Sequence, residues 1–112
     1  RLASRDVSKG LLASAQYITS GLRLAPGSPT QFLGFRRNSS KLLSDEVFDR
    51  ITFEFIGRPI DIALLKDVVM RINQAYARAG FNLSRASLPK QTVDDGLIEI
   101  RLVEGADLHH HF

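Results

Sequence analysis

The longest amphipathic stretch of the sequence, residues 61–79, predicts one helix of about five turns. Its apolar side chains recur at intervals of three and four residues, so they share one helical face. That face comprises Leu65, Val68, Val69, Ile72, Tyr76 and Ala79. Asp61 begins the helix, and Gly80 ends it as the glycine that commonly follows a last turn. A helix with one long apolar face must cover another layer of structure, which limits the chain to layered folds.

Two extended segments follow this helix and predict a β-hairpin with a long loop. Residues 81–88 (FNLSRASL) run extended and stop at Pro89, which cannot donate a hydrogen bond to a strand ladder. The DDG sequence at residues 94–96 is typical of a turn. Residues 97–103 (LIEIRLV) then alternate between apolar and charged side chains. The apolar face of this last strand carries Ile98, Ile100 and Leu102.

Upstream of the long helix, one segment predicts a strand and the next is ambiguous. Residues 31–37 (QFLGFRR) are rich in aromatic residues and precede turn residues, which predicts a first strand. Ser44 and the two acids after it predict a helix start. The sequence ITFEFI at residues 51–56 alternates like a strand. Against this, one helical stripe collects Val47, Phe48, Ile51 and Phe55. We therefore predict a helix over residues 45–56, with a strand over 51–56 as the alternative.

The predicted order is strand, helix, helix, strand, strand, a β-α-α-β-β arrangement of the α+β class. A crossover between two parallel strands of one sheet is right-handed in nearly all proteins. Two helices packed on one face of a three-stranded mixed sheet satisfy this order. We expect the last strand in the middle of the sheet, under the long helix. Strands 31–37 and 81–88 then become the two edges.

The length of 112 residues fits one domain with a limited core. The APGSP sequence at residues 25–29 predicts a boundary. We therefore assign residues 1–26 to a leader or linker segment and residues 27–106 to the domain. The chain opens on Arg1 rather than on methionine, from which we expect a piece of a longer protein.

The residue types and motifs present do not point to an enzyme, a cofactor, a metal site or a small-molecule substrate, and we predict none of them. The chain has no cysteine, and its three histidines stand together at residues 109–111. Consecutive side chains point in different directions, so we interpret residues 107–112 as an expression-tag remnant rather than a metal site. No GxGxxG, P-loop or GxSxG sequence occurs. The sequence contains no run of about 18 apolar residues, the length that a helix needs to cross a membrane.

The net charge of +3 hides an asymmetry between the two parts of the chain. Residues 1–43 contain seven Lys or Arg and one acid, hence +6, and residues 44–112 contain eight and eleven, hence −3. A basic first third could face nucleic acid or anionic lipid. Its charges are scattered without interleaved aromatic residues, so we predict no nucleic-acid partner. We interpret Arg36 and Arg37 as a solvated strand end.

Short motifs at the joints between these elements form a recognisable combination. A Tyr-x3-Gly-Phe sequence ends the long helix, an LPxQ sequence follows, and the closing strand ends in Glu-Gly. The matching residues are Gly57, Arg58, Pro59, Ile60, Leu65, Ile72, Asn73, Tyr76, Gly80, Phe81, Leu88, Pro89, Lys90, Gln91, Gly96, Ile98, Ile100, Glu104 and Gly105. With them, residues 31–105 resemble the POTRA (polypeptide-transport-associated) domain of two-partner secretion outer-membrane transporters, the hemolysin-activator class. Arg37 stands where that family usually has glycine.

The resemblance implies a periplasmic domain that precedes a covalently linked outer-membrane β-barrel. Such domains capture a secreted partner protein, the exoprotein, while it is unfolded, and pass it to the barrel. The module that bears LPxQ is usually the first of two in this family. Residues 1–26 resemble the variable lead-in to such a module.

An edge strand over residues 81–88 suggests how the domain binds an unfolded chain. Unpaired N–H and C=O groups at a sheet edge can pair with an extended guest, a binding mode called β-augmentation. Main-chain hydrogen bonds read little sequence, which suits a guest that arrives unfolded. The predicted partner-binding residues are Phe81, Asn82, Leu83, Ser84, Arg85, Ala86 and Tyr76.

Several of these features also have a structural interpretation. The LPKQ sequence at residues 88–91 can simply end a strand, with Gln91 bonded to the loop backbone, and we favour this role over guest contact. Tyr76 is expected in the core with its hydroxyl at the rim. The whole domain can serve instead as a spacer that positions neighbouring domains at the barrel mouth. A factor that assembles outer-membrane barrels is a third hypothesis, and the LPKQ sequence disfavours it.

Overall fold

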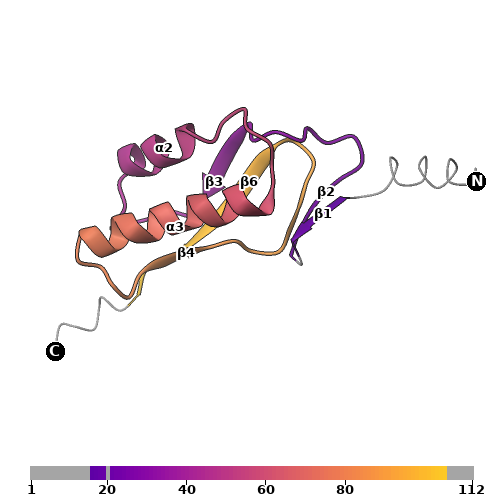
Figure 1. Cartoon of the computed structure of the whole chain (residues 1–112). Helices are drawn as coiled ribbons and strands as arrows, with labels where there is room; N and C mark the ends of the chain where they lie inside the picture. Colours follow the sequence, from indigo (N-terminus) through magenta and orange to yellow (C-terminus); the bar gives the residue numbers. More distant parts are fainter. Residues whose placement is uncertain (1–15, 20, 106–112) are drawn as a thin grey trace, which may run out of the picture.

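The computed structural model describes residues 16–19 and 21–105. Two helices lie on one side of a three-stranded sheet, and a small second sheet lies at one end of the domain (Figure 1). The predictions for residues 1–15 and for the tag remnant at 107–112 lie outside the described residues.

The central sheet has its strands in the order β3 (Gly34–Arg37), β6 (Leu97–Val103) and β4 (Arg85–Ser87). β3 runs parallel to β6, and β4 runs antiparallel to it. The last strand is therefore the middle one, as predicted, and the other two strands are the edges. The β-α-α-β-β core with a mixed sheet is confirmed.

The alternating sequence of β6 determines which face of this sheet the helices cover. Ile98, Ile100 and Leu102 are buried, whereas Glu99 and Arg101 on the opposite face are exposed. Helices α2 (Asp45–Phe53) and α3 (Ile62–Arg78) lie over the apolar face (Figure 1). Burying this face removes a continuous apolar strip from water, which is the main term that holds the layers together.

Helix α2 forms where two sequence interpretations competed. The Ser44 hydroxyl accepts a hydrogen bond from the Val47 N–H at 3.2 Å and so caps the first turn. The helix ends at Phe53 rather than at residue 56, and the chain turns at Gly57, whose φ of 87° favours glycine. The helix prediction is confirmed and the strand alternative is wrong, because the cap and the helical stripe outweigh local β-propensity.

Helix α3 confirms most of the predicted apolar face. Its first turn is capped by Asp61, whose Oδ1 accepts a hydrogen bond from the Leu64 N–H at 2.8 Å. Val69 is only partly buried, and Ala79 lies exposed at the C-terminal cap. The buried positions are Leu65, Val68, Ile72 and Tyr76.

The first residues of the strand predicted over residues 81–88 instead form the C-terminal cap of α3 and a turn. The Phe81 N–H donates to the Tyr76 carbonyl at 2.9 Å, and the Gly80 N–H donates back into the last turn at 3.0 Å, as in a Schellman motif. The Ser84 N–H then donates to the Phe81 carbonyl at 3.2 Å. The strand is therefore limited to Arg85–Ser87, because the preceding backbone closes the helix and turns.

The strand predicted over residues 31–37 is also shorter than expected. The Phe32 N–H donates to the Arg58 carbonyl at 2.9 Å, and the Gly57 N–H donates to the Phe32 carbonyl at 2.7 Å. Phe32 thus pairs with the turn after α2 rather than with β6. Only Gly34–Arg37 join the central sheet, because the upstream backbone already has other partners.

Asn38 explains where β3 ends. Its side-chain amide takes the place of the next strand residue: Nδ2 donates to the Leu102 carbonyl at 2.8 Å, and the Leu102 N–H donates to Oδ1 at 2.7 Å. The backbone can therefore leave the sheet after Arg37 while β6 keeps its hydrogen bonds on that side.

The segment expected to be a lead-in contributes two strands. β1 (Gln16–Thr19) and β2 (Leu22–Leu24) form an antiparallel hairpin. β2 pairs in parallel with β5 (Gln91–Val93), a short strand inside the stretch that the sequence predicted as a loop. Residues 16–24 therefore fold with the domain, and residues 25–29 form a turn inside it.

The hairpin packs through its alternate residues. Leu22 and Leu24 are 1% and 3% exposed, and Val93 on the paired strand is 2% exposed. All three belong to the hydrophobic core. The APGSP sequence is a break in regular structure, as its composition indicated. The core nevertheless includes residues on both sides of this turn.

Candidate partner-binding site

The predicted partner-binding residues fall into two groups. The side chains of Tyr76, Ser84 and Ala86 are buried. Asn82, Leu83 and Arg85 are exposed, and Phe81 packs partly against the core. The site predicted as one continuous edge is therefore divided, because residues 81–84 turn rather than extend.

The outer flank of β4 begins at Ala86. In an antiparallel pair, successive residues direct their N–H and C=O groups alternately toward and away from the partner strand. The Ala86 N–H donates to Oδ1 of Asn73, on α3, at 2.6 Å, so this residue faces away from β6. The next outward N–H belongs to Leu88, and no group among the described residues accepts a hydrogen bond from it.

Beyond Leu88 the flank is closed again by the N-terminal hairpin. The Gln91 N–H donates to the Gly21 carbonyl at 2.8 Å, and β5 continues in pairing with β2. The open part of the edge therefore lies between Ala86 and Gln91, which is shorter than predicted and shifted toward the LPKQ sequence.

A groove of about 790 Å³ lies beside this open stretch. One wall comes from α3, the other from Leu88 and Lys90, and the hairpin residues Thr19 and Gly21 lie at its end. The α3 wall includes Ile62, Lys66, Val69, Met70, Asn73 and Ala77. Ile62 and Met70 are 45% and 49% exposed, so the groove presents apolar surface to solvent.

The site residues predicted from the sequence did not include these α3 residues. A signal was present: Ile62 and Met70 widen the apolar arc of the helix beyond the stripe that its core contacts require. An apolar arc wider than the core contact is typical of a helix that meets a second partner.

Gln91 performs the structural role that the sequence favoured for it. Its Nε2 donates to the carbonyls of Pro89 and Glu99, each at 3.0 Å, and its Oε1 accepts from the Glu99 N–H at 2.8 Å. The side chain thus joins the loop to the outer part of β6 like one more strand residue. The LPKQ sequence thus ends in a residue whose side chain holds the loop against β6.

Replacing Gln91 by leucine should lower the free energy of unfolding by about 1 to 2 kcal/mol, because three backbone groups lose their partner in a partly exposed site. Urea denaturation followed by circular dichroism measures this change. Gln74→Leu, the same substitution at an exposed position of α3, is the matched control. Equal effects of the two substitutions would contradict the structural role of Gln91.

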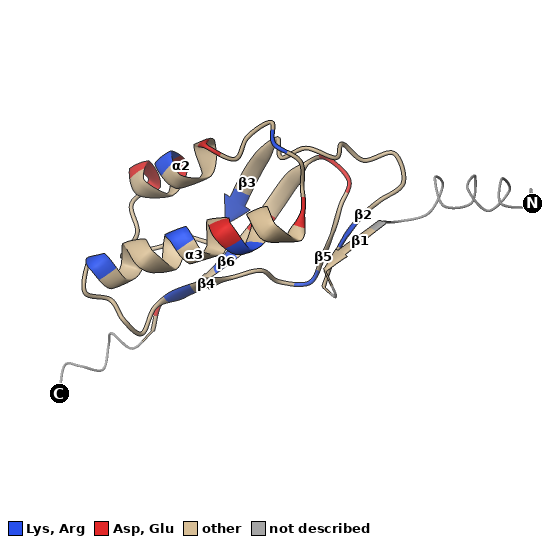
Figure 2. Cartoon of the chain, viewed as in Figure 1, with Lys and Arg blue, Asp and Glu red and all other residues tan. Residues whose placement is uncertain are grey.

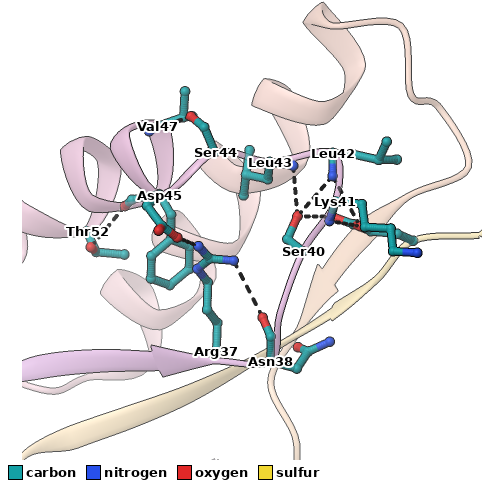
Figure 3. Close-up of polar contacts among 12 residues, drawn as sticks. Arg37, Asn38, Ser40, Lys41, Leu42, Leu43, Ser44, Asp45, Val47 and Thr52 are labelled. Atoms are coloured by element: carbon teal, nitrogen blue, oxygen red, sulfur yellow. Dashed lines mark hydrogen bonds and ion pairs between the residues drawn. The ribbon is translucent and has the colours of Figure 1, made fainter.

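A second polar cluster gathers around Glu104 at the end of β6. Its carboxylate accepts hydrogen bonds from the Tyr76 hydroxyl at 2.5 Å, from the Ser40 hydroxyl, and from the N–H groups of Lys41 and Leu42 at 2.8 and 3.3 Å. In the same loop the Ser40 hydroxyl also accepts hydrogen bonds from the N–H groups of Leu42 and Leu43, at 3.2 and 2.7 Å (Figure 3). The carboxylate therefore joins β6, α3 and the loop that precedes α2.

The acid–base properties of this cluster follow from its contacts. Burial raises the pKa of the Glu104 carboxyl, but the hydrogen bonds from Ser40, Tyr76 and the two N–H groups outweigh it, and the pKa is lowered. Burial, followed by the bond to Glu104, raises the pKa of the Tyr76 hydroxyl. Tyr76 is a core residue with its hydroxyl at the rim, as predicted, and remains a donor at neutral pH.

Of the two arginines at the end of β3, Arg36 is exposed, as expected of a solvated strand end, whereas the Arg37 side chain is largely buried. Arg36 pairs with Asp95 at 2.8 Å. Arg37 is only 14% exposed, pairs with Asp45, and lies 5.0 Å from the centre of the Phe48 ring (Figure 3). In the described part of the chain, charges of both signs are spread over helices and strands (Figure 2).

Among residues 16–19 and 21–105, no three His, Cys, Asp or Glu side chains lie close enough together to hold a metal ion. The histidines at 109–111 lie outside this part of the chain. None of the helices in the described residues has the length and apolar character that crossing a membrane requires.

The geometry can be compared with known proteins. The Heme/hemopexin transporter protein HuxB of Haemophilus influenzae is 27% identical over 92 residues, which cover 82% of this chain and 15% of HuxB. The solved structure of CdiB from Escherichia coli matches with a TM-score of 0.64 and 20% identity, over 93% of this chain and 20% of CdiB. The N-terminal domain of Omp85 from Thermosynechococcus elongatus matches with a TM-score of 0.60 and 23% identity, over 73% of this chain and 34% of that structure.

These matches differ in what they establish. The chain spans about 15% of the length of the curated relatives, and the structural likenesses show the fold. Residues 34–105, which contain both helices and the central sheet, match the family described as "POTRA domain, ShlB-type". The chain therefore belongs to the ShlB-type POTRA domain family.

Proposed function

We propose that this POTRA domain works in the periplasm as part of a two-partner secretion transporter. It binds a secreted partner protein while that partner is unfolded and delivers it to a covalently linked outer-membrane β-barrel. The guest docks as an extended segment along the outer flank of β4 and the residues after it, beside α3. Ordering a flexible guest keeps the affinity low, which allows the transporter to release it.

The observation that carries this proposal is the Leu88 N–H, a backbone donor beside an apolar groove that has no acceptor among the described residues. An unpaired strand edge is a template for another extended chain. Main-chain hydrogen bonds supply affinity in this binding mode, and pockets for alternate side chains supply selectivity. The groove wall of α3 offers such a surface through Ile62, Val69 and Met70.

The charges at the groove narrow the class of guest. Lys66 and Lys90 line it, and among the described residues no acidic side chain does. An extended segment with alternating apolar residues and a few acidic ones complements this surface in both hydrophobicity and charge.

The relatives support the wider proposal. HuxB carries the name of a transporter protein. The structure "POTRA1-2 of the periplasmic domain of Omp85 from Anabaena", with a TM-score of 0.57 and 16% identity, assigns the same fold to a periplasmic domain.

A synthetic peptide tests the binding mode directly. The probe alternates valine and threonine and carries glutamate at both ends, to match the groove and its lysines. Titrated into the 112-residue chain, it should shift the backbone amide signals of Ala86–Gln91 and of the facing α3 residues. The same peptide with N-methyl groups along one edge cannot form a ladder and should leave those signals unchanged.

A pair of substitutions at Leu88 separates backbone pairing from side-chain contact. Leu88→Pro removes the backbone N–H at this position and should abolish peptide binding, because a proline offers no donor. Leu88→Ala removes the side chain but keeps the donor, and should retain most of the binding. Equal binding by the two variants would exclude augmentation at this position. A proline at Arg85 does not serve here, because the Arg85 N–H faces β6.

One observation favours the structural alternative. Glu104, next to the point where the described chain ends, ties β6 to two other parts of the fold, α3 and the loop that precedes α2. Such a joint would hold a following domain at a defined angle, as a spacer requires. Failure of the peptide to shift any signal at about millimolar concentration would favour this spacer role over guest binding.

A further inference from the structure

Asn73 makes a contact that the proposed function does not require. Its Oδ1 accepts the Ala86 N–H at 2.6 Å, and its side chain lines the apolar groove. It also lines a second, smaller hollow of about 210 Å³ beside Arg85. The Asn73 side chain therefore bridges from α3 to β4, at the edge where an added strand would pair.

The hydrogen bond of Asn73 is made to the donor that a guest strand needs. The outward N–H groups of an edge strand recur at every second residue, which here means Ala86 and Leu88. Within residues 16–19 and 21–105 nothing accepts a hydrogen bond from the Leu88 N–H, whereas the Ala86 N–H is already bonded to Asn73. A guest can therefore form a first backbone bond at Leu88, but its next bond must replace the one that Asn73 makes.

We propose that Asn73 is an intramolecular competitor that occupies the edge of β4 until a guest displaces it, an inference that rests on the proposed function. In the free domain the amide oxygen substitutes for a guest carbonyl. When a guest arrives, a peptide carbonyl takes over the Ala86 N–H, and the Asn73 side chain turns into the groove or toward solvent. The exchange replaces one amide acceptor by another, so it lowers affinity without leaving a donor unpaired.

This competitor has two consequences for a transporter. It shields the edge from pairing with other exposed edges, which is a hazard of unprotected strands. It also subtracts one net hydrogen bond from the affinity of every guest, whatever the guest sequence, because both partners are amides. Asn73 thus sets the strength of guest binding rather than its selectivity.

Two substitutions at Asn73 change the competitor in opposite directions. Asn73→Ala removes the acceptor, so the valine–threonine peptide should bind about fivefold more tightly, the equivalent of one net hydrogen bond. Asn73→Asp replaces it by a charged acceptor, which makes a stronger bond, and should weaken binding by about fivefold or more. Peptide titration monitored by amide shifts measures both changes in the 112-residue chain.

A readout without peptide checks the same contact. The Ala86 amide should exchange with deuterium faster in Asn73→Ala than in the unsubstituted chain, and at least as slowly in Asn73→Asp. Urea denaturation of each variant supplies the stability against which these rates are compared. A residue with only a structural role would lose stability and peptide affinity together on substitution by alanine, whereas a competitor loses stability and gains affinity.

The outcomes separate this inference from the proposed function. If the unsubstituted chain binds the peptide and Asn73→Ala binds it equally or more weakly, the competitor role is wrong while guest binding stands. If neither binds, guest binding at this edge is wrong and the competitor role falls with it. Tighter binding by Asn73→Ala together with weaker binding by Asn73→Asp supports both.

Discussion

Replacing Leu24 by alanine is expected to lower the free energy of unfolding by about 2 to 4 kcal/mol. Leu24 is 3% exposed and belongs to the core, although it precedes the APGSP turn. Truncation leaves a cavity that the surrounding side chains cannot fill, because β2 is held in place by its pairing with β5. In a domain of this size the melting temperature should fall by about 10 to 20 °C.

Urea denaturation with circular dichroism measures this loss, and a substitution on the same hairpin provides the control. Tyr17 is 68% exposed, so Tyr17→Ala should change the free energy of unfolding by no more than about 0.5 kcal/mol. If Leu24→Ala were as mild as Tyr17→Ala, residues 16–24 would be a lead-in that contributes nothing to the domain, as the sequence first predicted.

Replacing Glu104 by alanine is the second large effect that we expect, a loss of about 2 kcal/mol in the free energy of unfolding. The substitution leaves the Tyr76 hydroxyl, the Ser40 hydroxyl and the N–H groups of Lys41 and Leu42 without their common acceptor. Water can reach part of this site, which keeps the loss below the sum of four buried hydrogen bonds.

Two comparisons isolate the contribution of the Glu104 carboxylate. Glu99→Ala removes an exposed glutamate side chain from the same strand and should change stability by less than about 0.5 kcal/mol. Tyr76→Phe removes one of the four donors and should have an intermediate effect. If Glu104→Ala and Glu99→Ala destabilise the domain equally, the hydrogen bonds around Glu104 do not stabilise it.

The pH dependence of stability follows from the lowered pKa of Glu104. The carboxyl titrates near its ordinary value of about 4.3 in the unfolded chain and below it in the folded domain. Its stabilising contribution is therefore complete above about pH 4.3 and is lost as the pH falls through the folded pKa. Glu104→Gln lacks this contribution, so the stability difference between the two proteins should shrink on acidification from neutral pH. A constant difference would contradict the assignment.

The long elements could be predicted because their signals are local. The stripe of α3 and the alternation of β6 each repeat several times within one segment. Even the ambiguous stretch at residues 51–56 was resolved by a local feature, the cap at Ser44. Helix periodicity and capping are properties of neighbouring residues, so a single sequence reveals them.

The ends of these elements depended on distant partners. Phe32 left the expected strand because the turn at residues 57–58 offered it hydrogen bonds. Residues 91–93 became a strand because β2, from the other end of the chain, lies beside them. The three residues QTV are too short a pattern to predict a strand. Its pairing partner, β2, lies before the APGSP turn and far away in the sequence.

The sequence by itself determined the POTRA architecture: which segments are helical, which strand is central, and which face of that strand is apolar. Only the tertiary structure decided which part of the edge is open, because that depends on where Asn73 of α3 and Gly21 of the hairpin meet the backbone after β4. The physical reason is that periodic patterns specify which face of an element is buried, whereas the occupancy of a single N–H group depends on side chains and backbone brought to it from elsewhere in the chain.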